Sequence, residues 1–170
     1  MRVKTWTRHT EKFHTYRDFE VYDEKNNLVA IASSKWVLVN LETGRITRLD
    51  ETIMNRYQPE ERSVFGEIQT EIEKLKEPDH STSAYLYRVQ RSNIDINNHM
   101  HNLYYLDLAY ETLPEEVYLQ SDFQHVEIMY KHEIKLADTV KCLYAKVEDA
   151  HYVTIKSEDE KCLHAIIKLS

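Results

Sequence analysis

The segment from residue 84 to residue 169 constrains the fold most, because its pattern changes once from strand to helix and then returns to strands. Residues 84–90, AYLYRVQ, are typical of a strand. In residues 103–113, LYYLDLAYETL, apolar side chains recur at helical spacing, and Pro114 ends the predicted helix. Four further strands are predicted, separated by short polar turns, at residues 123–134, 139–147, 152–156 and 162–169.

One helix followed by four consecutive strands predicts an α+β fold, in which an antiparallel sheet curls around the apolar helix to bury it. This is the order of elements in a hotdog fold. We therefore predict one complete hotdog lobe over residues 84–170.

The beginning of the chain predicts strands without a helix of their own. Residues 13–22 and 28–40 are rich in β-branched and aromatic side chains, and the polar turn at 23–27 separates them, which predicts a hairpin. A short extension is expected at 45–49. We interpret residues 1–56 as the strand-rich remainder of a similar first lobe that lacks its opening strand and helix.

Residues 57–83 are expected to form a connector that contains a helix and a loop. Pro59 stands near the start of the predicted helix and Pro78 follows its end, which places the helix over residues 59–77. Apolar side chains recur between these prolines at helical spacing: Phe65, Ile68, Ile72 and Leu75.

Composition excludes several classes of protein. The chain has 170 residues and a formal net charge of −7, which argues against nucleic-acid binding. No apolar stretch approaches the roughly 20 residues that span a bilayer, and the first residues lack the apolar core of a signal peptide. We expect a cytoplasmic protein without a membrane span. Two glycines are too few for a glycine-rich phosphate loop.

The cysteine and histidine residues do not predict a metal site. Cys142 and Cys162 are the only cysteines, and we expect both to be reduced thiols in strands. Cys162 and His164, together with His99 and His101, offer zinc ligands, but their spacing lacks a C-x2-C pair. No metal and no cofactor is expected.

Three polar residues spaced two apart lead into the predicted helix: Asp95, Asn97 and His99. On an extended backbone all three side chains project to one side. An acid, an amide and an imidazole together suit attack of water on a carbonyl, and the amino end of the helix adds positive potential. The alternative is that these residues form a loop and cap the helix.

Three blocks of sequence resemble the fatty acyl-ACP thioesterase family, whose members have two tandem hotdog lobes. The segment at 95–105, DINNHMHNLYY, is similar to that family's D-x-N-x-H motif. Upstream, YRDFEVYD at 16–23, IASSKWVLVN at 31–40 and TGRITRL at 43–49 resemble the end of its first lobe. The third block is VEIMYKHEI at 126–134.

The resemblance implies hydrolysis of fatty acyl-ACP thioesters to free fatty acids in fatty acid biosynthesis. Its functional Asp, Asn and His fall on Asp95, Asn97 and His99, and its catalytic Glu falls on Glu133. Ile134 stands where plant members have cysteine, which favours attack by water over a cysteine nucleophile. Water would be activated by Glu133 with His99, and the oxyanion would be bound by Asn97 and the helix start.

The implied partner is an acidic acyl carrier protein with a phosphopantetheine arm, which calls for a locally basic docking face. Arg91 and Lys131 are the expected substrate-binding cations, with Arg88 and Lys135 as further candidates, and Tyr105 is a candidate for the wall of the acyl site. We also expect a homo-oligomer, since an uncovered half-sheet leaves unpaired edges.

Two other functions remain open from the sequence. Acyl-CoA thioesterases of the hotdog type share a similar helix start, although they do not account for the blocks in residues 16–49. A non-catalytic hotdog module that binds acyl chains is the other alternative, because much of the first lobe is absent.

Overall fold

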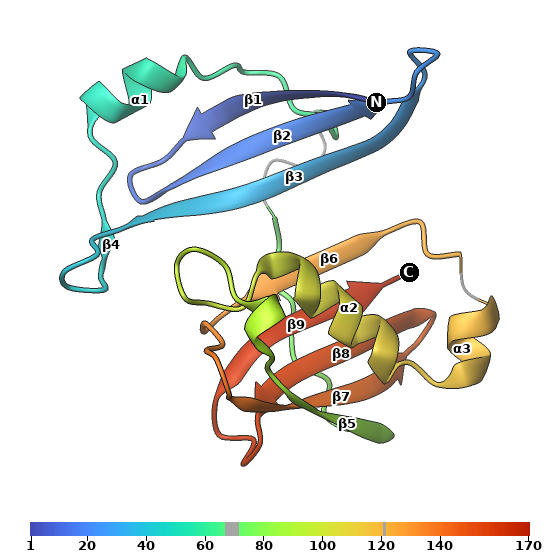
Figure 1. Cartoon of the computed structure of the whole chain (residues 1–170). Helices are drawn as coiled ribbons and strands as arrows, with labels where there is room; N and C mark the ends of the chain where they lie inside the picture. Colours follow the sequence, from blue (N-terminus) through green and yellow to red (C-terminus); the bar gives the residue numbers. More distant parts are fainter. Residues whose placement is uncertain (67–71, 121) are drawn as a thin grey trace. The chain divides into compact units, whose positions relative to one another are not determined.

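The computed structural model describes residues 1–66, 72–120 and 122–170, and the chain divides into two compact units, Met1–Glu73 and Lys74–Ser170. Each unit contains one antiparallel sheet (Figure 1). The division falls inside the segment 57–83. No helix in the described ranges is long and apolar enough to cross a membrane.

The second unit is a five-stranded antiparallel sheet in the order β5-β7-β8-β9-β6. Each of the five strands overlaps a segment predicted from the sequence. β8 is longer than expected, and β6 is shorter because the chain leaves the sheet after Tyr130. The strands are β5 (Ser83–Arg88), β6 (Val126–Tyr130), β7 (Thr139–Val147), β8 (Ala150–Ser157) and β9 (Leu163–Leu169).

One helix, α2 (Asn102–Thr112), lies across this sheet (Figure 1). Its buried face consists of Tyr105, Leu108, Ala109 and Thr112, as the helical spacing predicts. Tyr105, Leu108 and Ala109 belong to one hydrophobic core with the inward residues of β7, β8 and β9. The α+β prediction is therefore confirmed. A short helix that the sequence did not reveal, α3 (Glu115–Gln120), follows Pro114.

The first unit is a four-stranded antiparallel sheet in the order β1-β2-β3-β4. The predicted hairpin is confirmed as β2 (His14–Tyr22) and β3 (Leu28–Val39), and the short extension as β4 (Ile46–Thr47). The edge strand β1 (Arg2–Thr10) was not predicted.

The helix expected over residues 59–77 is wrong for the described part of that segment. Residues 59–66 and 72–77 contain no helix, and residues 67–71 lie outside the described residues. The helix of this region is instead α1 (Glu51–Tyr57), which follows Asp50. Pro59 comes after α1 because proline is favoured just past a helix end as well as at a helix start.

Backbone groups of residues 60–64 bond to the sheet and not to one another. The Glu60 N–H donates to the Thr7 carbonyl (2.8 Å), and the Arg62 carbonyl accepts from the Trp6 indole (3.0 Å). The Val64 N–H donates to the fully buried Asp18 carboxylate (2.9 Å). These long-range partners, which no local pattern reveals, replace the bonds of a helix.

Candidate active site

Residues 95–99 form a tight turn, not the extended segment that the spacing suggested. One Asp95 carboxylate oxygen accepts the N–H groups of Asn97 (2.8 Å) and His99 (3.2 Å). Asn98 adopts the left-handed conformation with φ 63°, which asparagine tolerates better than most residues. Asp95 thus holds the turn and places His99 at its end. It is a loop residue, as the alternative expected, but the residue that caps α2 is His101.

The turn lowers the pKa of Asp95 below its ordinary value. Partial burial opposes this by raising the pKa, but the backbone hydrogen bonds from Asn97 and His99 and the side-chain bond from Asn97 outweigh it. The carboxylate that holds the turn is therefore ionised at neutral pH.

We expect acid to release this turn. Because the pKa of Asp95 is lower in the folded chain, its contribution to stability is complete above the ordinary pKa and is lost as the pH falls through the folded value. In an NMR titration, the amide shifts of Asn97 and His99 should move with a midpoint below 3.8. Asp95→Asn should abolish that transition. A midpoint at or above 3.8 in the unmodified chain would contradict this geometry.

The segment after the turn runs antiparallel to the residues that follow β6. The backbones of His99 and Lys135 form an isolated antiparallel β-bridge. The Met100 N–H donates to the Ile134 carbonyl (2.8 Å). Met100 and Ile134 are both buried, which anchors the two segments in the core of the second unit. This pairing brings Glu133 next to His99.

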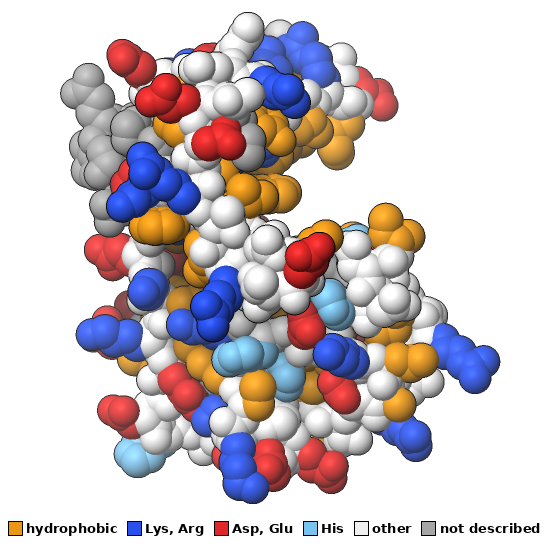
Figure 2. Space-filling model, turned by 90° about the vertical axis from the view of Figure 1, so that its left-hand side faces the viewer, with side chains coloured by type: hydrophobic (Ala, Val, Ile, Leu, Met, Phe, Trp, Pro, Cys, Tyr) orange, Lys and Arg blue, Asp and Glu red, His pale blue; other side chains and the backbone are white. Residues whose placement is uncertain are grey.

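The His99 and Glu133 side chains meet at the surface of the second unit. His99 Nε2 lies 3.3 Å from Glu133 Oε2, and Lys135 Nζ lies 3.3 Å from the other oxygen of the same carboxylate. About half of the Glu133 side chain is exposed, so water reaches the pair. Figure 2 shows histidine side chains beside acidic and basic ones on one face of this unit.

The other polar residues near the turn have distinct places. The Asn97 side chain is exposed next to Asp95. His101 caps α2, because its Nδ1 accepts the Leu103 N–H (3.2 Å), as expected for a helix-start residue. No group of three or more potential metal ligands occurs in the described ranges of the chain.

A buried asparagine that the sequence did not single out fixes the approach to the turn. The side-chain oxygen of Asn93 accepts from the Tyr87 hydroxyl (2.8 Å) and from the Gln90 N–H (2.8 Å). The backbone carbonyl of Asn93 accepts the His101 N–H (2.8 Å). Its only sequence signal was its place in the polar segment before the helix.

The structure places the predicted substrate-binding residues in different environments. Tyr105 is buried on α2, where burial raises its pKa to about 12, and its ring packs edge-on against Tyr130 at 5.1 Å. The Tyr105 hydroxyl therefore stays protonated at neutral pH. Arg91 and Lys131 are exposed. Burial also raises the pKa of the Cys142 thiol to about 12, so that thiol is a poor nucleophile.

The second unit has the sheet and central helix of a hotdog fold, and His99 and Glu133 are in contact at its water-accessible surface. Comparisons with known proteins identify the family. The profile of the acyl-ACP thioesterase C-terminal domain matches residues 76–169, and that of the N-terminal domain matches residues 1–57. The chain belongs to the acyl-ACP thioesterase family.

Similar proteins agree with this assignment. Oleoyl-acyl carrier protein thioesterase 2, chloroplastic, of Arabidopsis thaliana is 27% identical over 83% of the chain, and the oleoyl enzyme of Coriandrum sativum is 26% identical over 83%. These alignments cover 41% and 40% of the relatives, so the chain spans about two fifths of their length.

Solved structures support the same fold. An acyl-ACP thioesterase from Bacteroides thetaiotaomicron matches 98% of the chain with a TM-score of 0.80 and 22% identity, covering 66% of that protein. The 12:0-ACP thioesterase from Umbellularia californica matches 99% with a TM-score of 0.83 and 17% identity, also covering 66%. The hotdog prediction is confirmed.

Proposed function

We propose that this chain hydrolyses fatty acyl-ACP thioesters and releases free fatty acids. The observation that carries the proposal is the 3.3 Å approach of His99 and Glu133 at a water-exposed surface, within the region that matches the C-terminal domain of the family. An imidazole and a carboxylate in contact are a suitable pair for general acid–base catalysis.

In the proposed reaction, a water oxygen attacks the thioester carbonyl carbon while the His99–Glu133 pair takes a proton from that water. The developing oxyanion is stabilised by the exposed Asn97 amide and the amino end of α2. The carbon–sulfur bond then breaks, and the leaving thiolate receives a proton. Asp95 acts through the turn, which holds Asn97 and His99 in place.

The environments of Ile134 and Cys142 also fit attack by water. Ile134 follows Glu133, is fully buried, and offers no nucleophile. Cys142 is buried on β7 with its pKa raised to about 12. Neither position supports a covalent acyl-cysteine intermediate.

We expect the exposed cations near His99 and Glu133 to attract the acidic carrier protein. Reversing the charge of Lys131, in Lys131→Glu, should raise KM for an acyl-ACP several-fold at low salt, because charge complementarity mainly affects encounter. The effect should shrink at high salt and should be smaller with the matching acyl-CoA. Lys146→Glu, at the end of β7, is the matched control. An equal increase for both variants would contradict docking near Lys131.

Parallel assays with matched acyl-ACP and acyl-CoA thioesters test the substrate assignment. The proposal predicts a higher kcat/KM for the acyl-ACP. Faster turnover of acyl-CoA would favour the acyl-CoA thioesterase alternative. If the folded chain binds acyl chains but hydrolyses neither substrate, the non-catalytic module is the better description.

A further inference from the structure

Lys135 lies on the same side of the paired segments as His99 and Glu133. The backbone bridge sets Lys135 directly opposite His99, and residues opposite one another in an antiparallel pair point to the same side. Glu133 precedes Lys135 by two residues, and both are exposed, whereas Ile134 between them is fully buried. This alternation is the one expected for an extended segment. The register therefore gathers an imidazole, a carboxylate and an ammonium on one surface.

The backbone that carries Lys135 is fixed by a turn. The Lys135 N–H donates to the Asp138 carboxylate (2.8 Å), and the Asp138 N–H donates to the Lys135 carbonyl (3.2 Å). The Asp138 carbonyl in turn accepts the N–H of the buried Val89 (2.9 Å), which follows β5. The Lys135 side chain therefore extends from an ordered position beside the end of β5.

The two oxygens of the Glu133 carboxylate have different partners. Oε2 faces His99 Nε2 and Oε1 faces Lys135 Nζ, each at 3.3 Å. The last torsion of a glutamate side chain has a broad distribution, so one contact alone leaves the plane of the carboxylate poorly defined. A second contact on the other oxygen opposes rotation of that plane. Lys135 thus restricts the carboxylate to the orientation in which Oε2 meets the imidazole.

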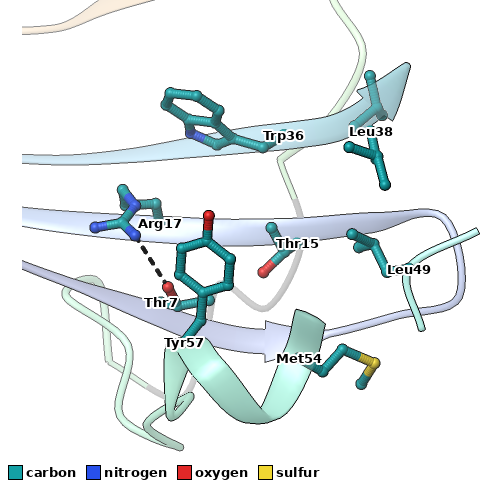
Figure 3. A pocket seen from close by; sticks show the side chains of 9 residues that line it. Thr7, Thr15, Arg17, Trp36, Leu38, Leu49, Met54 and Tyr57 are labelled. Carbon is teal, nitrogen blue, oxygen red and sulfur yellow. Dashed lines mark hydrogen bonds between the residues drawn. The ribbon is translucent and has the colours of Figure 1, made fainter. Parts of the chain in front are cut away.

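This arrangement differs from that of a cation on a neutral group. Arg17, at the wall of a pocket in the first unit, donates to the Thr7 hydroxyl (3.2 Å) (Figure 3). That contact orients the guanidinium against an uncharged partner. The Lys135 ammonium instead lies on a carboxylate that takes part in the proposed reaction, and hydrogen bonds between charged groups are stronger than those to neutral ones. The position of Lys135 therefore bears directly on the acid–base pair.

We propose that Lys135 is a positioning residue for the His99–Glu133 pair. Its ammonium holds the Glu133 carboxylate against the imidazole and does not itself touch the thioester. This inference rests on the proposed hydrolysis, in which the pair takes a proton from water. It also separates Lys135 from the carrier-docking role expected from the sequence, because an ammonium that lies on Glu133 presents less net charge to an acidic partner.

Steady-state kinetics of the full chain tests this role with two substrates: an acyl-ACP, and the matching acyl thioester of N-acetylcysteamine, which has neither phosphate nor carrier protein. Lys135→Met should lower kcat about fivefold for both, the upper range for an exposed ion pair, with little change in KM. Lys135→Arg should restore most of the rate, because a guanidinium also donates to a carboxylate. Lys168→Met, which removes the lysine paired with Glu127 (2.7 Å), is the matched control and should retain the original kcat.

An unchanged kcat in Lys135→Met would overturn the inference. An increase in KM confined to the acyl-ACP would do the same, since that result assigns Lys135 to carrier docking. An equal fall in kcat for Lys168→Met would also contradict it, because the effect would then follow the total charge of the chain and not the position of the lysine.

A measurement without turnover keeps this inference apart from the proposed hydrolysis. In ¹³C NMR relaxation of the full chain, the Glu133 side chain should become more mobile in Lys135→Met and stay ordered in Lys135→Arg. Equal mobility of Glu133 in both variants and the unmodified chain would overturn the positioning role, whatever the hydrolysis rate. An unmodified chain that hydrolyses neither thioester contradicts the proposed function alone.

Discussion

Glu133→Gln is expected to reduce the hydrolysis of an acyl-ACP thioester by a factor of about 10² to 10⁴, the usual contribution of a general acid–base group. Glutamine retains the size of the side chain and its hydrogen bonding, but it neither accepts a proton from water nor carries the charge that faces His99 and Lys135. The loss should appear in kcat, while KM for the acyl-ACP changes little.

Glu127→Gln is the matched control for this prediction. Glu127 also pairs with a lysine, since Lys168 Nζ lies 2.7 Å from its carboxylate, but it is on β6 and remote from the turn at residues 95–99. Its hydrolysis rate should stay within about twofold of the original, because Glu127 has no part in the proposed reaction and a partly exposed ion pair contributes little to stability. An undiminished rate in Glu133→Gln would remove the catalytic assignment.

Asp18→Ala should lower the free energy of unfolding of the first unit by about 3 kcal/mol. The Asp18 side chain is fully buried and accepts hydrogen bonds from the Ser33 hydroxyl (2.6 Å) and the Val64 N–H (2.9 Å). Its removal leaves two donors without this acceptor, each at a cost of about 1–3 kcal/mol. The hydrogen bond to Val64 also ties residues 60–66 to the sheet. This segment and the sheet should therefore lose stability together.

Urea unfolding followed by tryptophan fluorescence measures this effect, because Trp6 is buried under Arg62 in the same unit. Glu24→Ala, at an exposed turn position of the same unit, is the control and should change the free energy by less than about 0.5 kcal/mol. An Asp18→Ala chain as stable as the control would show that the carboxylate does not hold this segment.

Local patterns were sufficient to predict most of the fold. The strands of the second unit have alternating or β-branched sequences bounded by turn residues, and the buried face of α2 follows directly from its helical spacing. β1 was missed because its alternation, RVKTWTRHT, is interrupted by charged side chains on an edge strand. The helix of the connector was predicted in the wrong place because Pro59 was taken as its start, whereas prolines occur near both ends of helices.

The candidate site could be predicted from the sequence less completely than the fold. The motif identified Asp95, Asn97 and His99, but the spacing of two suggested an extended backbone, whereas hydrogen bonds to Asp95 form a turn. Glu133 emerged only from the resemblance, since no local pattern reports its contact with His99. The Lys135 contact with Glu133 depends on tertiary pairing and was not predicted.

The central claim is that His99 and Glu133 act as one unit in thioester hydrolysis, and a double-mutant cycle tests it most directly. The measurement compares kcat for one acyl-ACP in the original chain, His99→Ala, Glu133→Gln and the double variant, all shown to be folded. If the pair acts together, the double variant should be no more than a few-fold slower than the slower single variant. Losses that multiply, or a double variant as fast as the original chain, would contradict the claim.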